Sequence, residues 1–218
     1  MSKRYDLIVF DWDGTVVDSA AAIVGSIQAA CHGLDLPVPD EEAARQVIGL
    51  SLEQALRRAV PGVPEAKLPD LIALYRHHFI VQSEAVHMFE GARETIAELF
   101  NAGYLLGVAT GMSRAGLERA LNSSGMKNYF HATRTADVTF SKPDPTMLLE
   151  LIAELAVDPE RTLMVGDTTH DLLMAQNADV DAVAVTHGAH LPEQLKMLRP
   201  LALVEDFAEL RTWLKANA

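Results

Sequence analysis

The sequence has very little cysteine, few basic residues and no long apolar run, and each shortage excludes a class of protein. Cys31 is the only cysteine among 218 residues, so the chain cannot form an intrachain disulfide or a zinc site rich in thiolates. We expect this thiol to be a small packed apolar side chain. Lysine and arginine number 18 against 30 aspartates and glutamates, and a formal net charge of −12 argues against a nucleic-acid backbone as the main partner.

The apolar runs are too short for a bilayer or for a secretory leader. A transmembrane helix needs about 20 consecutive apolar residues, so no membrane partner is expected. The run that follows the basic start ends at Asp11, before it reaches the length of a signal-peptide hydrophobic region. We therefore expect a cytoplasmic location. Hydrophobic residues make up 49% of the chain, without repeats or low-complexity blocks, which indicates a folded protein with a substantial core.

Apolar periodicity divides the chain into two kinds of segment. After an apolar strand at 7–10, residues 18–82 show helical patterns without a convincing strand, whereas helices and short strands alternate from residue 90 onward. The helical patterns before residue 90 cover 18–32, 40–59 and 65–82. Later helices are expected at 91–102, 114–123, 144–156, 170–177 and 207–215, and strands at 104–109, 131–135, 162–165, 182–185 and 201–204.

This alternation predicts an α/β fold, a parallel sheet flanked by helices. Residues 1–15 and 91–218 would form the catalytic core, and residues 16–90 would form a small helical cap domain inserted after the first strand. The segments 16–20 and 82–90 are hinge candidates.

The most informative motif ends the first strand. Apolar residues 7–10 stop at the sequence DWDGT, residues 11–15, which places two carboxylates two positions apart beyond a buried strand. Active sites of parallel α/β sheets gather at this end of the strands. Asp11 can attack phosphorus and form an aspartyl-phosphate, while Asp13 is placed to exchange protons as a general acid and base. The competing interpretation is an Asp-Gly turn that merely ends a strand.

Three later strands also end in polar residues. Thr110 and Gly111 follow the second strand and offer a hydroxyl and backbone N–H groups to phosphate oxygens. Lys142 lies in a proline-rich segment and can neutralise phosphate and aspartate charge. Asp167 ends the fourth strand and Asp171 follows one helical turn later; such oxygen ligands suit Mg²⁺. A turn, a solvated lysine and a helix cap would explain each motif singly, so the argument depends on their joint order.

With these four motifs in order, the sequence resembles the haloacid dehalogenase-like (HAD) hydrolase superfamily over nearly its full length. The closer resemblance is to its phosphoglycolate phosphatase-like subgroup, through residues 10–19, 48–51, 142–145 and 166–168. The resemblance implies a Rossmann-like core, a cap that closes over the site, and Mg²⁺ as cofactor. For catalysis it implies Asp11 as nucleophile, Asp13 as general acid and base, and Lys142 as a further catalytic residue. Thr110, Gly111 and Lys142 would bind the phosphate. Asp11, the Asp13 backbone carbonyl and Asp167 would be the metal ligands, and Asp171 would support the metal site.

Two positions depart from the pattern of the resembled family. Gly111 stands where many relatives carry asparagine, and Gln176 stands where phosphoglycolate phosphatases commonly have glycine. Neither position belongs to the core mechanism. Asp13 argues against dehalogenation, because the dehalogenases lack this aspartate. Several histidines lie on different elements without zinc-site spacing, and we expect structural or surface roles for them: His77, His78, His87, His170, His187 and His190.

The sequence thus predicts a Mg²⁺-dependent phosphatase that hydrolyses a small phosphomonoester of metabolism, with phosphoglycolate as the leading candidate. Gly49, Ser51 and Glu53 are the candidates for substrate contact in the cap. A sugar-phosphate mutase of the β-phosphoglucomutase type is an alternative, although such relatives usually carry a histidine where this chain has Ala20 to Ala22. A pyrophosphatase or nucleotidase of the same superfamily, or a non-catalytic binding protein on the same scaffold, are the others.

Overall fold

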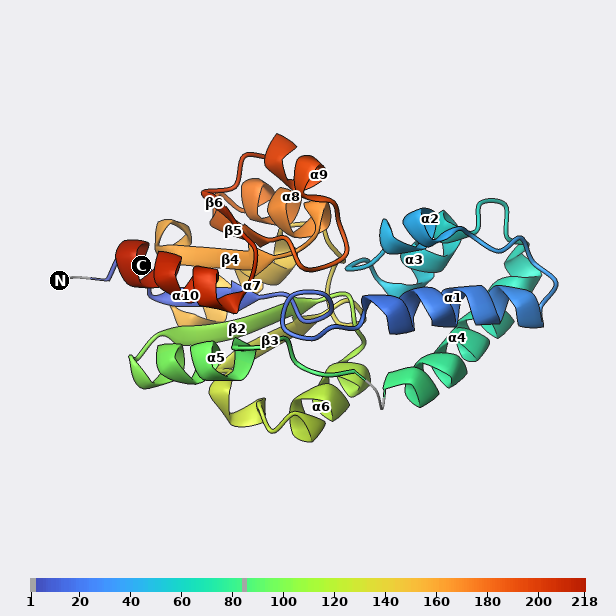
Figure 1. Ribbon diagram of the computed structural model, residues 1–218, viewed down its shortest axis with the longest axis horizontal. Coiled ribbons are helices and arrows are strands. Elements are labelled where there is room, and N and C mark those ends of the chain that lie inside the picture. Colours follow the sequence, from blue (N-terminus) through green and yellow to red (C-terminus); the bar gives the residue numbers. More distant parts are fainter. Residues whose placement is uncertain (1–2, 84–85) are drawn as a thin grey trace.

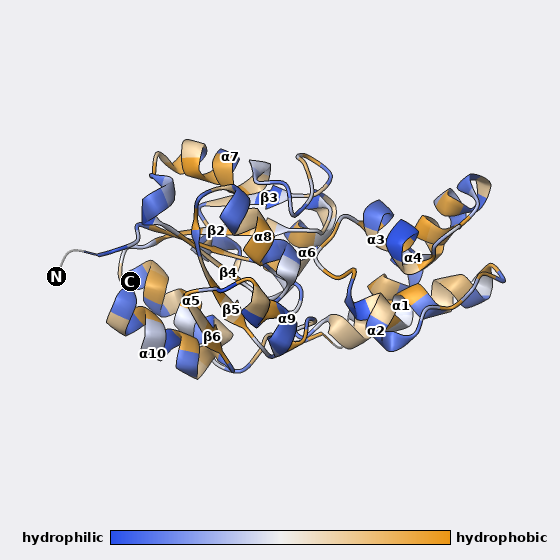
Figure 2. Ribbon diagram, turned by 90° about the horizontal axis from the view of Figure 1, so that it is seen from above, coloured by the Kyte–Doolittle hydropathy of each residue, from blue (hydrophilic) through white to orange (hydrophobic). Residues whose placement is uncertain are grey.

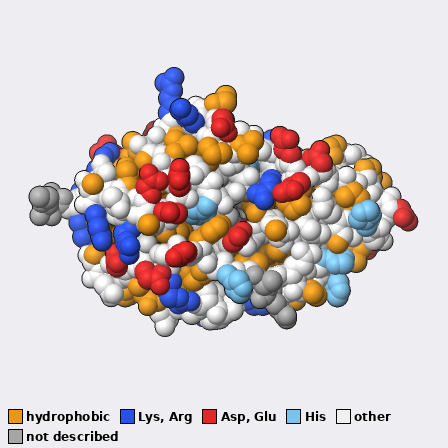
Figure 3. Space-filling view, in the orientation of Figure 1, with side chains coloured by type: hydrophobic (Ala, Val, Ile, Leu, Met, Phe, Trp, Pro, Cys, Tyr) orange, Lys and Arg blue, Asp and Glu red, His pale blue; other side chains and the backbone are white. Residues whose placement is uncertain are grey.

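The computed structural model describes residues 3–83 and 86–218. Figure 1 shows a sheet with helices on both faces and, beside it along the long axis, a group of helices from the first third of the chain. Acidic and basic side chains are interspersed over the face drawn in Figure 3. In the described part of the chain, no helix is both long enough and apolar enough to cross a membrane.

Six parallel strands form the sheet, in the order β3-β2-β1-β4-β5-β6. The first strand in sequence, β1, is central, and all four of its residues are buried because neighbouring strands and helices cover it on every side. The strand order reverses at β1, which lies between β2 and β4. In open α/β sheets such a reversal opens a crevice beyond the carboxyl ends of the strands. The bounds are β1 Leu7–Phe10, β2 Leu105–Thr110, β3 Ala132–Thr135, β4 Thr162–Gly166, β5 Asp181–Val185 and β6 Ala202–Val204.

Alternate residues of the strands point to opposite faces, and a separate set of helices covers each face. Ile8 and Phe10 pack with α5, α6 and α10, whereas Leu7 and Val9 pack with α7, α8 and α9. These helices turn apolar residues inward and polar residues outward (Figure 2). Their bounds are α5 Ala92–Asn101, α6 Arg114–Ser123, α7 Thr146–Leu155, α8 Thr169–Asn177, α9 Pro192–Met197 and α10 Phe207–Asn217. The predicted Rossmann-like α/β fold is confirmed.

The helical cap consists of α1 Ala20–Gly33, α2 Glu41–Arg45, α3 Leu52–Ala59 and α4 Leu68–Gln82, with a 3₁₀ turn at Glu65–Lys67. It has an apolar core of its own, in which Ile27, Leu56 and Leu71 are almost completely buried. Cys31 is buried there with no disulfide, as the sequence predicts.

Two expectations about the helices were wrong. Residues 40–59 show one helical pattern, but the structure divides them into α2 and α3, separated by a loop in which Gly49 has a φ of 91°. A left-handed backbone conformation of this kind cannot continue a helix. Helix α9 was also not predicted from the sequence. Its six residues bury only Leu195 and so show no apolar periodicity.

The two connections between the cap and the sheet lie side by side. Val17 pairs antiparallel with Met88, the Asp18 N–H donates to the His87 carbonyl at 2.9 Å, and the Phe89 N–H donates to the Val16 carbonyl at 3.0 Å. Residues 84 and 85, in the second predicted hinge segment, lie outside the described residues. The pairing of Val17 with Met88 and its two flanking hydrogen bonds lie in the described parts of the two predicted hinge segments.

Candidate active site

The carboxyl ends of three neighbouring strands bring the predicted polar residues together. Asp11 follows β1, Thr110 ends β2 and Asp167 follows β4, and all three side chains are completely buried. Pairing continues beyond β1, because the Asp11 N–H donates to the Val165 carbonyl at 2.9 Å. The sheet register therefore fixes these groups at one edge.

Lys142 lies between two carboxylates. Its Nζ is 2.7 Å from Asp11 Oδ1 and 2.7 Å from Asp171 Oδ1, and its side chain is fully buried. Burial alone would lower the pKa of Lys142, but the two carboxylates outweigh it and raise the pKa above its usual value. The lysine is therefore held as a cation beside the predicted nucleophile.

Three carboxylates form a compact cluster at this edge. One oxygen each from Asp11, Asp167 and Asp171 lies within 4.8 Å of the other two. Burial, with Asp171 and Asp167 adding to it and Lys142 opposing it, raises the pKa of Asp11 well above its usual value. Burial and the nearby Asp171 raise the pKa of Asp167 to about 7, although other contacts oppose the shift. One lysine does not compensate the negative charge of this cluster.

A hard cation such as Mg²⁺ fits these donors. Among the described residues, no group donates a hydrogen bond to the buried Asp11 Oδ2, so this carboxylate has acceptor capacity that the chain does not use. Asp167 is held in place by the Thr15 hydroxyl, which donates to Oδ1 at 2.6 Å, and by the Ala189 N–H, which donates to Oδ2 at 2.7 Å. Such secondary contacts orient metal ligands.

Asp171 has a structural role as well as its place in the cluster. The backbone N–H and the hydroxyl of Thr168 donate to Asp171 Oδ2 at 3.0 and 2.6 Å, which caps the start of α8. Asp171 therefore contributes to the start of α8 and also lies in the acidic cluster.

Asp13 differs from these carboxylates in its surroundings. It is the most exposed of the four aspartates, at 9%, and it lines the cavity described below. Burial raises the pKa of Asp13, while the Ser19 hydroxyl, which donates to Oδ1 at 2.7 Å, opposes the shift. A carboxyl group that retains a proton more readily and borders the cavity suits a general acid.

The end of β2 faces the cap. Thr110 Oγ1 accepts a hydrogen bond from the Met112 N–H at 3.2 Å. A Cβ on Gly111 would lie 2.3 Å from the Leu50 carbonyl oxygen and 2.6 Å from that of Gly49. Because the cap backbone occupies this space, no side chain fits at position 111, which gives a physical reason for the departure noted in the sequence.

Further contacts hold the cap against the sheet domain. The Ser51 N–H donates to Ser141 Oγ at 2.8 Å, next to Lys142. The Gln46 carbonyl lies 3.1 Å from His170 Nε2, and the Gln46 side-chain amide donates to Gln194 at 3.0 Å. Ser141 and Gln194 were not predicted from the sequence as contact residues. The position of Ser141 next to Lys142 in the sequence is the one signal that could have pointed to Ser141. Thr15 and Ser19 were also missed as site residues, although both belong to the first motif run.

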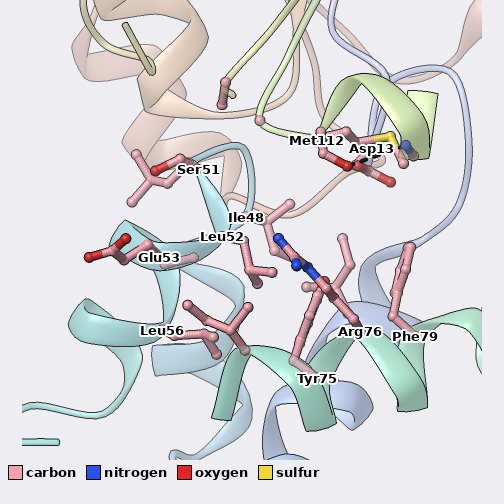
Figure 4. Close-up of a pocket in the computed structure, with 18 of the residues that line it drawn as sticks. Asp13, Ile48, Ser51, Leu52, Glu53, Leu56, Tyr75, Arg76, Phe79 and Met112 are labelled. Carbon is pink, nitrogen blue, oxygen red and sulfur yellow. Dashed lines mark hydrogen bonds between the residues drawn. The ribbon is translucent and has the colours of Figure 1, made fainter. Parts of the chain in front are cut away.

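A cavity of about 730 Å³ lies between the cap and the sheet domain (Figure 4). Asp13 and Gly111 border it from the sheet domain, and Gly49, Ser51 and Glu53 border it from the cap. The structure thus places all three cap candidates on one cavity together with Asp13. Such concave, largely apolar spaces are typical of sites for small molecules.

The fold and the site define a phosphatase built on a parallel α/β sheet with a helical cap. The sequence model described as haloacid dehalogenase-like hydrolase matches residues 8–185, and the chain belongs to this family. The chain is 39% identical over 210 residues to the probable phosphatase IndB of Dickeya dadantii, an alignment that covers 94% of this chain and 91% of the relative.

Two further comparisons agree with this assignment, the first in sequence and the second in fold. A phosphoglycolate phosphatase of Nitrosococcus oceani is 27% identical over 228 residues, with 100% of both chains covered. The crystal structure of a predicted phosphoglycolate phosphatase from Haemophilus somnus superimposes with a TM-score of 0.89 at 23% identity, over 98% of this chain and 99% of the other. The expected resemblance and the class of enzyme are confirmed.

Proposed function

We propose that this enzyme is a Mg²⁺-dependent phosphatase that hydrolyses a small phosphorylated metabolite through an aspartyl-phosphate on Asp11. One observation carries the proposal: the buried Asp11 has one oxygen 2.7 Å from Lys142 Nζ and the other without a hydrogen-bond donor among the described residues. The contact with Lys142 orients the carboxylate, and the oxygen without a donor has a lone pair available for nucleophilic attack. As the sequence predicts, the location would be cytoplasmic.

Asp11, the Asp13 backbone carbonyl and Asp167 would hold the Mg²⁺, with Asp171 in support. When bound, the ion would supply positive charge to the transferring phosphoryl group and to the cluster. The remaining cationic and donor groups belong to the chain. Lys142, the Thr110 hydroxyl and the Gly111 N–H would bind phosphoryl oxygens and orient the phosphorus toward Asp11. The three residues lie at or beside the carboxyl edge of the sheet, beyond β1 and β2.

The reaction would proceed in two displacements. Asp11 Oδ2 forms a bond to phosphorus as the ester P–O bond breaks, and Asp13 gives its proton to the departing alkoxide oxygen. Asp13, now ionised, takes a proton from a water molecule that attacks the aspartyl-phosphate. Inorganic phosphate leaves, and both aspartates return to their starting states. The raised pKa of Asp13 suits both transfers.

The test is phosphate release from a panel that contains phosphoglycolate, sugar phosphates, nucleoside monophosphates and pyrophosphate, with Mg²⁺ and with chelator. Phosphoglycolate is the leading candidate because relatives of this chain bear that name. Asp11→Asn should abolish release in a folded protein. Asp18→Asn is the matched control, because its side chain is exposed and lies in the same segment.

Release that persists at the wild-type rate in folded Asp11→Asn would refute Asp11 as nucleophile. Transfer of the phosphoryl group back to a sugar phosphate, faster than release, would identify a mutase instead. Absence of any release from metal-loaded protein would favour the non-catalytic alternative.

A further inference from the structure

The cavity beyond Asp13 is much larger than a two-carbon leaving group requires. It measures about 730 Å³, and most of its lining is apolar. Figure 4 shows Ile48, Leu52 and Leu56 on one side of it, and Tyr75 and Phe79 projecting from α4 on the other. Glycolate would leave most of this apolar surface without contact, whereas a ligand that removes it from water gains affinity.

Two stacked aromatic rings form part of this lining. The rings of Tyr75 and Phe79 lie 5.7 Å apart, nearly parallel at 8°, on successive turns of α4. Aromatic side chains bury a large apolar area and pair favourably with other rings. The cap therefore offers a surface for a leaving group with a substantial apolar body.

The charged residues that line the cavity divide into two groups, paired and unpaired. Two acidic ones are already engaged: Glu53 accepts from Arg57 Nε at 3.0 Å, and Asp137 accepts from the Arg114 N–H at 2.9 Å and from the Thr135 hydroxyl at 2.8 Å.

The two basic residues of the lining, Arg76 and Arg119, form no ion pair or side-chain hydrogen bond within residues 3–83 and 86–218. By contrast, Arg57 on α3 pairs with Glu53, and Arg114, on the same helix as Arg119, pairs with Glu118. Past the reacting end, the cavity thus carries two guanidinium groups without an ion-pair partner among the described residues, whereas Asp137 is held by two neutral donors.

These two arginines reach the cavity from opposite sides. Arg76 lies on α4 of the cap, and Figure 4 shows its guanidinium group projecting toward the centre of the cavity. Arg119 lies on α6 beside the sheet. An anion that contacts both would join the cap to the sheet domain, and guanidinium groups bind carboxylate and phosphate oxygens with paired N–H donors.

We propose that the preferred substrate is a phosphomonoester whose leaving group has an apolar or aromatic body and carries a second anionic group, a carboxylate or phosphate, that Arg76 and Arg119 bind. This inference rests on the proposed phosphatase function and specifies its substrate class. Phosphoglycolate supplies the second anion but not the body. The two arginines are then specificity residues, and they take no part in the displacement at phosphorus.

The experiment compares esters of matched chemistry. Benzyl phosphate, 4-carboxybenzyl phosphate and phosphoglycolate all release an alkyl alcohol, and they differ in the body and in the second anion. We expect wild-type kcat/KM for 4-carboxybenzyl phosphate to exceed the other two values by roughly tenfold, as a charge-assisted contact would give. A benzyl ester with a phosphate in place of the carboxylate distinguishes the two kinds of anion.

Arg76→Gln and Arg119→Gln should each lower the ratio of kcat/KM for the carboxylated over the neutral benzyl ester, mainly through KM. Comparing ratios cancels differences in intrinsic reactivity between the esters. Arg114→Gln is the matched control, since it removes the same charge from the same helix outside the cavity lining, and its ratio should equal that of the wild type.

Two results would overturn this inference while the phosphatase function stands: an unchanged ratio in both arginine variants, or a preference of the wild type for phosphoglycolate over 4-carboxybenzyl phosphate. Absence of hydrolysis of every ester by the metal-loaded wild type would overturn the proposed function and the inference with it.

Discussion

Gly111, at the end of β2, lies directly against Leu50 of the cap, so closely that a Cβ on the glycine would stand 2.3 Å from the Leu50 carbonyl oxygen. The contact is with backbone, which cannot rotate away as a long side chain can. Any residue other than glycine at position 111 must therefore displace the loop between α2 and α3, and this loop carries five residues of the cavity wall, residues 47–51.

Gly111→Ala should consequently impair closure of the cap. We expect kcat/KM to fall roughly tenfold to a hundredfold, since small misplacements of an active-site wall have effects of that size. Gly33→Ala, whose Cβ would meet only the flexible Leu74 Cδ1 at 3.2 Å, is the control. Steady-state kinetics check the result, and equal activity of the two variants would show that the cap does not need this contact.

Lys142→Met should destabilise the metal-free protein. The lysine is the cation that both Asp11 and Asp171 face at 2.7 Å, and its loss leaves buried carboxylates without a counterion. Such a loss costs about 3–5 kcal/mol in free energy of unfolding. Added Mg²⁺ should restore part of it, because the ion supplies positive charge to the same cluster.

Denaturant unfolding with chelator and with Mg²⁺ measures this effect. The control is Lys215→Met, because that lysine is 69% exposed and lies 3.5 Å from Glu98. An exposed pair of this kind contributes less than about 1 kcal/mol. Similar losses in the two variants would contradict a central role for Lys142 in balancing the cluster.

Metal binding should depend on pH through Asp167. In the metal-free protein the pKa of this carboxyl is raised to about 7, so a proton competes with the metal below that pH. We expect Mg²⁺ to bind roughly tenfold more weakly at a pH of about 6 than at about 8. Thermal-shift titrations at both pH values measure this, with Asp167→Asn as the variant in which the part of the dependence due to Asp167 is lost.

The stability of the metal-free protein depends on pH in the opposite direction: Mg²⁺ binding becomes stronger as the pH rises, whereas the contribution of Asp167 to stability becomes smaller. A raised carboxyl pKa means that the folded metal-free protein binds the proton more tightly than the unfolded chain does. This contribution of Asp167 to stability is complete below the usual carboxyl pKa and is lost as the pH rises through about 7. If the free energy of unfolding of the metal-free protein depended on pH in the same way in wild type and Asp167→Asn, the raised pKa of Asp167 would be contradicted.

The strands and the acidic motifs could be predicted because local features encode them. An uninterrupted apolar run needs burial on both faces, so residues 7–10 could be predicted as a buried strand, and the charged residues that follow it are costly anywhere except at a site. Parallel pairing then places Asp11 and Asp167 on one edge without further information.

The cap interface could not be predicted in the same way, because tertiary contacts determine it. The helical pattern continues on both sides of Gly49, and only the structure shows that the chain breaks there, with a left-handed φ at Gly49 and its carbonyl against Gly111. Arg76 and Arg119 lie on exposed helix faces, where a sequence gives the same signal for a solvated charge and for a ligand contact. Their separation of over forty positions hides the shared cavity.

The pairing of Val17 with Met88 has a consequence for how such proteins change over evolutionary time. Because the chain leaves the sheet domain and returns to it at neighbouring points, the whole helical insert can be exchanged for another without moving the ends of the strands that carry the reacting groups. One core can then acquire a new leaving-group preference by replacing a module, while the chemistry at phosphorus is inherited intact.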